Sequence, residues 1–356
     1  MKVNAVVAQE ASKGVDQRIA LLSLVAVVMV VFIHTAQHPA KEMWSWWSMQ
    51  IFGHGICNMA VPFFFIVSGY FLGQHFGESE WWRTQVLKRV KTILVPFFAW
   101  NLICFAHSMG FALMTNLKAG VAWNFELPVD SVSLMRVLGV YPDYPFSVPT
   151  WYLRALFLYV LISPIFARKG YVVLFLVGVA KVVFDVFGWS GGVLNVVNPT
   201  GLFYFGLGCY LSQHPVHIAR RPRLGWICVA VAFCLAGLRA AIIHGEWMHG
   251  DLVGCVMIPI ALIGFWMALP DKVVPGFIRN STMAIYLSHT LIAAVFFDIL
   301  RIIWPLSVRP EGADMWFQTF GAQILLVGFQ LLIALLFARL VSRSKLLNAI
   351  LFGGRC

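Results

Sequence analysis

Residues 19–36 read IALLSLVAVVMVVFIHTA, an apolar run whose single ionisable side chain, that of His34, lies near its end. A run of roughly 20 apolar residues is long enough to cross a bilayer as a helix. Because an ionisable ring is costly to expose to lipid, His34 must face the protein interior or a wet cavity. Taken alone, a structural histidine hydrogen-bonded to a neighbouring helix is the simpler interpretation, and a general base acting on a hydroxyl group is the functional one.

The rest of the chain has the same apolar character. Of its 356 residues, 60% are hydrophobic and 12% are charged, and the mean hydropathy is +0.81. This is more apolar surface than a soluble core can bury, and the runs are continuous rather than alternating, which indicates helices and not barrel strands. We therefore expect an all-α, polytopic transmembrane bundle of about ten helices, at residues 19–36, 55–73, 92–115, 149–167, 171–188, 199–213, 225–243, 252–269, 281–300 and 319–341.

The basic residues follow the positive-inside rule. The formal net charge is +11, and if the amino terminus is cytoplasmic, most of the 26 Lys and Arg residues fall in inner segments. We therefore place both termini in the cytoplasm, with residues 1–18 and 342–356 as the cytoplasmic ends of a single integral-membrane domain, residues 1–356. Topology and contact with anionic membrane lipid explain the basic charge, so a nucleic-acid partner is not indicated.

The cysteines carry no metal or disulfide pattern. There are seven of them, an odd number, and they show neither CxxC nor Cys/His ligand spacing. We interpret them as buried, reduced thiols, and we expect no metal site and no disulfide framework.

Two further features concern packing. The sixth apolar run contains Gly201, Gly206 and Gly208, so we expect it to be tilted, broken or closely packed against a neighbour. Lys181 and Asp185 lie four residues apart in the fifth run, a spacing that predicts an internal ion pair.

A second candidate region begins with the stretch 61–72, VPFFFIVSGYFL. Its phenylalanines are compatible with lipid contact, and Ser68-Gly69 permits the close approach of a helix or a ligand. A basic stretch follows. Its cations either anchor the chain to acidic headgroups or hold the phosphates of a large anionic cofactor, and they are Arg83, Lys88, Arg89 and Lys91.

The fourth apolar run opens with WYLR, residues 151–154, and places Arg154 at about the depth of His34. Arg154 either extends to the interface or stabilises a developing oxyanion or a sugar carboxylate. The outer loops are rich in aromatic and acidic residues, with Trp44, Trp46 and Trp47 in the first and Glu126, Asp130, Tyr141, Asp143 and Tyr144 in the second. Trp and Tyr at these places are typical of an interfacial belt, and a sugar-binding platform is the alternative. His289 lies mid-membrane in the ninth run.

Four stretches follow one another along the chain, and they are VMVVFIH at 28–34, VPFFFIVSGYFL at 61–72, KRVKTILVPFFAW at 88–100 and WYLRALF at 151–157. A weaker fifth signature is STMAIYLSH at 281–289. In content and order, these stretches resemble the acyltransferase-3 family of bacterial inner-membrane O-acyltransferases, in particular the compact members that modify cell-surface polysaccharides or their lipid-linked precursors.

The resemblance implies ten helices, a cytoplasmic acetyl-CoA or other acyl-CoA donor, and an acceptor hydroxyl presented at the outer face. His34 matches the family's essential histidine. The family usually has Arg or Lys eleven residues before that histidine, whereas this chain has Ser23. Arg18, Arg89 and Lys91 are the candidates to replace that cation.

The resulting hypothesis is an O-acetyltransferase of the bacterial inner membrane that acts on a polysaccharide or an undecaprenyl-linked saccharide, with no metal. His34 would deprotonate the acceptor hydroxyl or carry the acyl group transiently. The expected site residues are His34, Arg154 and Tyr152 for catalysis, Arg83, Lys88, Arg89, Lys91, Ser68 and Ser23 for the donor, and Trp151, His289 and Asp143 for the acceptor.

Two other classes of protein remain as alternatives. A transporter or flippase for a lipid-linked saccharide would use the intramembrane His and Arg for gating or binding, although no repeated pair of broken helices is evident. A membrane glycosyltransferase would need a pair of outer-face carboxylates near the first run, where Glu42 stands alone.

Overall fold

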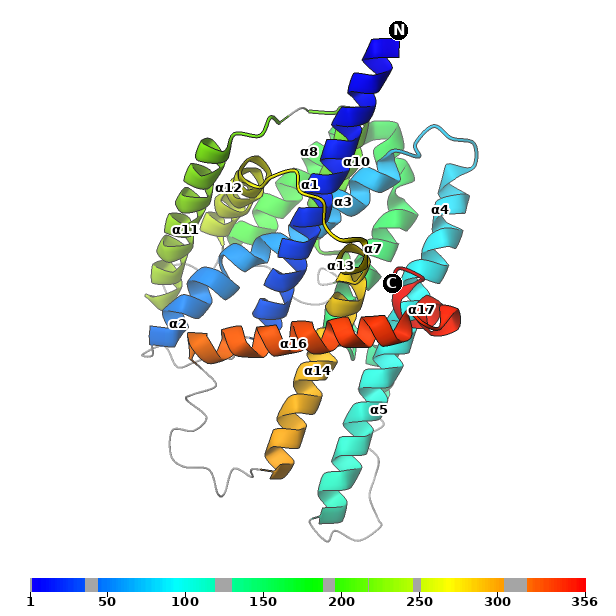
Figure 1. Cartoon of the computed structure of the whole chain (residues 1–356), viewed down its shortest axis with the longest axis vertical. Helices are drawn as coiled ribbons and strands as arrows, with labels where there is room; N and C mark the ends of the chain where they lie inside the picture. Colours follow the sequence, from blue (N-terminus) through cyan, green and yellow to red (C-terminus); the bar gives the residue numbers. More distant parts are fainter. Residues whose placement is uncertain are drawn as a thin grey trace.

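The computed structural model describes residues 2–35, 44–118, 130–187, 196–216, 218–245, 251–303 and 319–356, so Glu42 lies outside the described residues. Every regular element in these ranges is helical (Figure 1). The longer helices are α1 (Lys2–Thr35), α3 (Ala60–Gly73), α5 (Val95–Lys118), α7 (Trp151–Ile162), α8 (Pro164–Phe187), α10 (Pro199–Gln213), α11 (Pro222–His244), α12 (Leu252–Ala268), α14 (Thr282–Ile303) and α16 (Phe320–Val341). Shorter helices are α2 (Trp44–Ser48), α4 (Trp81–Arg89), α6 (Ser131–Leu138), α13 (Gly276–Asn280) and α17 (Lys345–Phe352).

The predicted all-helical architecture is confirmed for the described part of the chain. Each of the predicted apolar runs falls on one of the longer helices. Seven helical stretches in the described ranges are long and apolar enough to cross a membrane, and two of them continue through short helices, at Trp44–Gly73 and Trp81–Thr115. Helices α7, α10 and α12 are shorter, so a count of ten membrane spans stays a prediction.

Helix α1 occupies the centre of the bundle. It packs against α3, α14 and α16, and α16 crosses both α1 and α14 in Figure 1. The contact face of α1 is made of small apolar side chains, since Ala26, Val27 and Val30 are almost completely buried. Small side chains let neighbouring helices approach closely, and this brings polar groups on α1 within reach of α14.

Helix α1 runs without a break from Lys2 to Thr35, so residues 2–18 continue the helix of the first apolar run. Arg18 Nε lies 2.7 Å from an Asp271 carboxylate oxygen, and its guanidinium stacks 5.0 Å from the centre of the Trp266 ring. The Arg18 guanidinium, hydrogen-bonded to Asp271, holds the pKa of that carboxyl below its usual range. Arg18 therefore ties α1 to the segment that follows α12.

A buried ionic cluster links α8, α10 and α12. Lys181 Nζ lies 2.6 Å from Asp185 Oδ2, which confirms the predicted ion pair. Thr200 donates to the other oxygen of Asp185 at 3.0 Å, and the Cys255 thiol donates to Asp185 Oδ2 at 3.1 Å. Each charge is paired, so the cluster joins the three helices. All seven cysteines are free thiols.

Helices α3 and α10 are in close contact, as the glycines of the sixth run predicted. A Cβ atom added to Gly69 would lie 2.0 Å from the Phe205 carbonyl oxygen, and one added to Gly208 would lie 2.0 Å from that of Ile66. Both partners are backbone atoms, which side-chain rotation cannot move away. Glycine at these two positions is therefore required by the helix–helix distance.

Replacing Gly208 with alanine is expected to lower the free energy of unfolding by about 1–3 kcal/mol, because the added methyl group forces α3 and α10 apart. Gly237→Ala is the matched control, since a Cβ there meets nothing within 4 Å. That control should be neutral or slightly stabilising. Thermal unfolding of both variants in detergent measures the difference, and equal melting temperatures would show that the contact is looser than described.

Candidate active site

Two histidines from different helices meet in the bundle. The ring of His34, near the end of α1, lies 5.2 Å from the ring of His289 on α14, with an interplanar angle of 44°. His289 is completely buried, and His34 is partly buried. Because two charged imidazolium rings at this distance would repel each other in a low-dielectric interior, at most one of the pair is protonated. A neutral imidazole is the form that accepts a proton.

The hydrogen bond of His289 defines its tautomer. Its Nδ1 lies 3.1 Å from the carbonyl oxygen of Ile285, which can only accept, so Nδ1 carries the hydrogen. The opposite nitrogen, Nε2, is then an acceptor. It is buried and has no hydrogen-bond partner among the described groups. Leaving a buried acceptor unsatisfied costs about 1–3 kcal/mol. A hydrogen bond to Nε2 from His34 or from a bound ligand would remove this cost.

A cavity of about 800 Å³ lies next to this pair. Its walls come from α1, α3, α4, α7, α13, α14 and the segment after α17. Five of the residues predicted from sequence line it together, and these are Ser23, Ser68, Lys88, Arg89 and Tyr152. Their convergence from four separate helices is what the hypothesis of a common site requires.

The cavity is strongly basic. Among the described residues, four cationic side chains line it and no aspartate or glutamate side chain does. The cations are Lys88, Arg89, Arg279 and Arg355. Such a lining favours a ligand with several negative charges, and phosphate groups are the usual partners of clustered arginines.

One wall of the cavity is aromatic and leads toward the histidines. The Tyr152 hydroxyl lies 3.0 Å from Ser68 Oγ, and the Tyr152 ring lies 5.7 Å from the Tyr286 ring. The ring of His289 follows, 6.2 Å from that of Tyr286. Neither His34 nor His289 lines the cavity, so Tyr286 separates it from the pair.

The length from the Ser23 end of the cavity to His34 can be read along α1. Ser23 lines the cavity and is eleven residues before His34, which corresponds to about 16 Å along a helix axis. The Ser23 hydroxyl donates to the Ile19 carbonyl at 2.7 Å within its own helix. Ser23 therefore contributes a neutral surface at the position where the resemblance predicts a cation.

Arg154, predicted to act in catalysis, has other partners. Its guanidinium donates to the carbonyl oxygens of Gly139, Tyr141 and Asp143 at 3.2, 2.6 and 2.7 Å. It lies two positions after Tyr152, which turns the two side chains to nearly opposite faces of α7. The structure thus gives Arg154 the task of holding the segment before α7 and does not bring it to the cavity.

Several other predicted residues also lie outside the cavity lining. Arg83 and Lys91 are exposed on α4 and just after it. Trp151 packs its ring 6.2 Å from that of Phe65, and Asp143 contributes its carbonyl oxygen to Arg154. Of the three proposed replacements for a cation at position 23, Arg89 alone lines the cavity.

Sequence reasoning missed two of the cavity cations, Arg279 and Arg355. By position in the sequence, both belong only to the basic residues of the inner segments that set the topology. No local pattern distinguishes them, because Arg279 follows a loop and Arg355 lies more than 60 residues further along the chain. Folding of the carboxyl-terminal segment against α5 and α14 brings them together.

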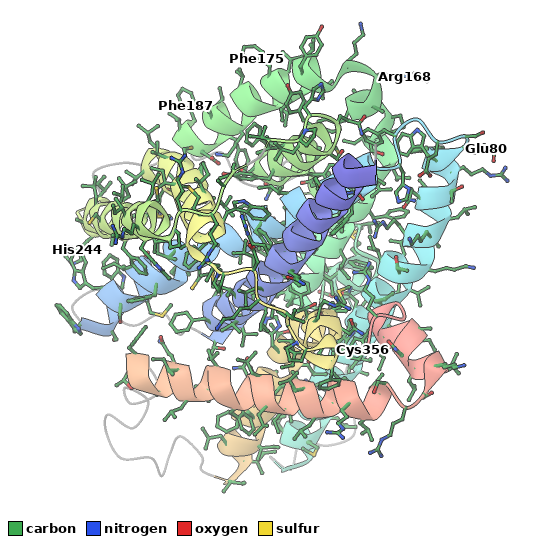
Figure 2. The ribbon with its side chains drawn as sticks, turned by 45° about the horizontal axis from the view of Figure 1, so that its top comes forward. Glu80, Arg168, Phe175, Phe187, His244 and Cys356 are labelled. Atoms are coloured by element: carbon green, nitrogen blue, oxygen red, sulfur yellow. The ribbon has the colours of Figure 1, made fainter. Side chains whose placement is uncertain are left out.

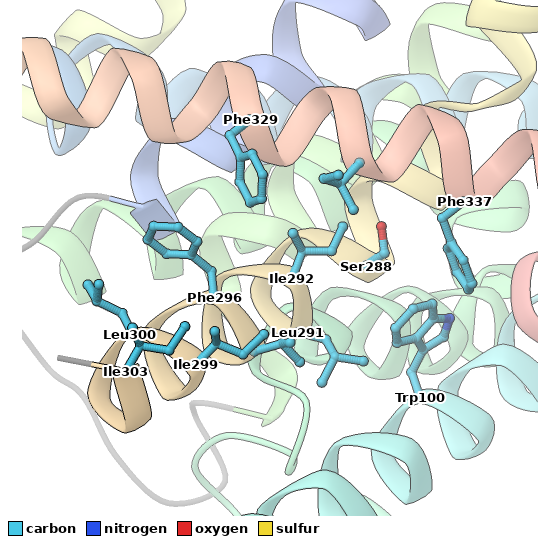
Figure 3. A pocket seen from close by; sticks show the side chains of 12 residues that line it. Trp100, Ser288, Leu291, Ile292, Phe296, Ile299, Leu300, Ile303, Phe329 and Phe337 are labelled. Atoms are coloured by element: carbon cyan, nitrogen blue, oxygen red, sulfur yellow. The ribbon is translucent and has the colours of Figure 1, made fainter. Parts of the chain in front are cut away.

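A second cavity, of about 470 Å³, lies between α5, α14 and α16 (Figure 3). Its lining is apolar apart from Ser288 and the indole nitrogen of Trp100, and it extends along α14 from Ser288 to Ile303. Ser288 precedes His289, so this groove and the basic cavity lie on different faces of α14 with the histidine between them. In the part of the chain described here, no group of three or more potential metal ligands occurs.

Comparison with known proteins agrees with the motif resemblance. The profile of the acyltransferase-3 family, described as an acyltransferase domain, matches residues 17–344. The chain is 24% identical over 247 residues to the succinoglycan biosynthesis protein ExoH of Rhizobium meliloti (strain 1021), an alignment that covers 62% of each protein. No solved structure matches the chain. Because the family profile covers most of the sequence, including His34 and His289, the chain belongs to the acyltransferase-3 family.

Proposed function

We propose that this protein is an inner-membrane acyltransferase that moves an acyl group, with acetyl as the first candidate, from acyl-CoA to a hydroxyl of a polysaccharide or its undecaprenyl-linked precursor. One observation carries the proposal. A cavity whose described lining has four cationic side chains and no Asp or Glu side chain adjoins a pair of histidines, of which His289 is completely buried and His34 partly buried. This arrangement supplies an anion-binding entrance and a base within one site, as transfer from a large phosphorylated donor requires.

In our proposal, the donor enters the cavity with its phosphates at the cations and its acyl end toward the histidines. Its phosphates pair with the cations, and Ser68 and Tyr152 line the path of the pantetheine arm toward Tyr286. The separation of about 16 Å along α1 between Ser23 and His34 favours a long, flexible acyl carrier over a compact one. We place the basic entrance at the cytoplasmic side and His34 toward the periplasm, in accordance with the distribution of basic residues.

His34 is the proposed general base. It takes the proton of the acceptor hydroxyl as the oxygen attacks the thioester carbonyl, and a tetrahedral oxyanion forms. The carbon–sulfur bond then breaks, and the leaving CoA thiolate takes the proton from His34. Tyr152 is our candidate to donate to the oxyanion, since its hydroxyl lies in the cavity wall. On substrate binding, His289 Nε2, which has no partner among the described groups, accepts a hydrogen bond from His34 and so fixes which nitrogen faces the acceptor.

Two observations support a saccharide acceptor that is linked to lipid. The similar protein from Rhizobium meliloti is named for succinoglycan biosynthesis. The apolar groove along α14 begins next to His289 and offers a hydrocarbon environment for a long lipid chain. A soluble sugar has no hydrocarbon chain that could occupy this groove.

Transfer from labelled acetyl-CoA by the purified protein in proteoliposomes tests the proposed function. We expect label in a polysaccharide or lipid-linked saccharide supplied on the opposite side of the membrane. The rival transporter predicts movement of the unmodified saccharide across vesicles without acyl-CoA. Such movement, together with no detectable acyl transfer from any acyl-CoA tested, would replace the proposed function with the rival one.

A further inference from the structure

The carboxyl-terminal segment folds back onto the basic cavity. Helix α17 packs against α5 and α14, and the segment after it returns toward α13. The side chain of Asn348 holds this return, since it accepts from the Cys356 backbone nitrogen at 3.1 Å and donates to the Cys356 carbonyl oxygen. Figure 2 labels Cys356 in this position, and its thiol lies 3.7 Å from the Asn280 carbonyl.

A glycine makes the return possible. Gly353 has φ of +63°, in the left-handed region, and a Cβ there would lie 2.7 Å from the Thr92 carbonyl oxygen. The backbone of the segment therefore presses directly against Thr92, three residues before α5 begins. As a result Gly353, Gly354, Arg355 and Cys356 all line the cavity.

Arg355 enters the cavity without an acidic partner. Its hydrogen bond to the sulfur of Met283, at 3.9 Å, is to a weak acceptor. Among the described residues, no carboxylate lies within ion-pair distance of it. Burial lowers the pKa of the Arg355 guanidinium. A buried cation of this kind is unfavourable unless an anion joins it.

Arg89, the last residue of α4, lines the same cavity as Arg355. Its Nε is buried and has no hydrogen-bond partner among the described groups. Two guanidinium groups that share one cavity repel each other, and the described lining of the cavity includes no Asp or Glu side chain. A phosphate removes both problems at once, because its oxygens accept several hydrogen bonds from arginine and its charge offsets the repulsion.

We propose that the carboxyl-terminal segment is part of the donor site, with Arg355 and Arg89 binding the phosphate groups of the CoA nucleotide from two sides. This inference rests on the proposed function. It assigns donor binding to a segment that the sequence alone predicts to be no more than the cytoplasmic carboxyl-terminal end. Lys88 and Arg279 line the same cavity and add two further positive charges. A phospholipid headgroup presents the same phosphate chemistry, and the experiment must separate the two sources.

Binding of CoA and of pantetheine, which lacks the nucleotide phosphates, should be measured by calorimetry in nanodiscs of phosphatidylcholine. We expect Arg355→Gln to weaken CoA binding by about 10- to 100-fold, the range for loss of a hydrogen bond to a charged group. Its binding of pantetheine should equal that of the wild type. Arg355→Lys should recover part of the affinity for CoA. Arg343→Gln, which removes an exposed cation just before α17, is the matched control and should bind CoA normally.

The outcomes separate this inference from the proposed function. Wild-type binding of CoA with equal affinity in Arg355→Gln overturns the inference alone. If the wild type binds no CoA and transfers no acyl group, the proposed function fails as well. If Arg355→Gln binds CoA as tightly as the wild type but loses affinity for phosphatidylglycerol in the disc, the lipid headgroup occupies the Arg355 site, and the assignment to the donor is overturned. The Asn348 contacts to Cys356 do not involve Arg355, so the segment should stay docked in the variant.

Discussion

Replacing His34 with alanine is expected to lower the turnover of acyl transfer by a factor of about 10²–10⁴, the contribution typical of a positioned general base. The cavity and its cations lie toward the other end of α1, so CoA binding should be unchanged. A loss of turnover with intact donor binding is the signature of a group that acts on the reacting atoms. Radiolabel transfer in proteoliposomes measures the first quantity and calorimetry the second.

A matched histidine control excludes a general effect on folding. His214 is exposed at the end of α10, where it stacks on Tyr210, and His214→Ala should transfer acyl groups normally. His34→Gln keeps a polar side chain at the site and should remain folded yet inactive. Normal turnover in a well-folded His34→Ala protein would remove the base from the proposed mechanism.

Replacing His289 has the second largest expected effect, a loss of turnover of about 10- to 100-fold, as expected for an outer group that orients a reactive one. In the structure, Nδ1 of His289 donates to the Ile285 carbonyl oxygen, so Nε2 remains as an acceptor. The centres of the His289 and His34 rings are 5.2 Å apart. His289→Ala removes that acceptor. In this variant His34, the proposed base, is still present, but the group that selects its tautomer is lost.

Glutamine at position 289 provides the distinguishing test. Its amide oxygen is an acceptor at about the position of Nε2, so His289→Gln should recover part of the turnover that His289→Ala loses. The pH profile of kcat/KM should shift in His289→Ala, because a partner that accepts from His34 increases the basicity of its other nitrogen. If Gln and Ala are equally impaired and the profile does not move, His289 serves packing alone.

The residues of the candidate site differ in how far sequence could predict them. His34 is evident from its place in an apolar run, and the convergence of Ser23, Ser68, Lys88, Arg89 and Tyr152 agrees with the motif resemblance. Arg154 shows that the depth of a residue in the membrane is not enough to place it in the site. A helix position gives depth but not direction, and Arg154 turns toward the carbonyl oxygens of the preceding segment instead of the cavity.

Hydropathy and motif order by themselves determined that this protein is a helical membrane protein, where its helices lie and which histidine must be kept from lipid. These properties are local, because the apolarity and length of a run decide whether a helix crosses a bilayer. The tertiary structure alone decided that His34 meets His289, and that Arg355 shares a cavity with Arg89. Such pairings join residues hundreds of positions apart, and they depend on how helices cross and how a terminal segment folds back, for which the spacing of residues along the chain carries no signal.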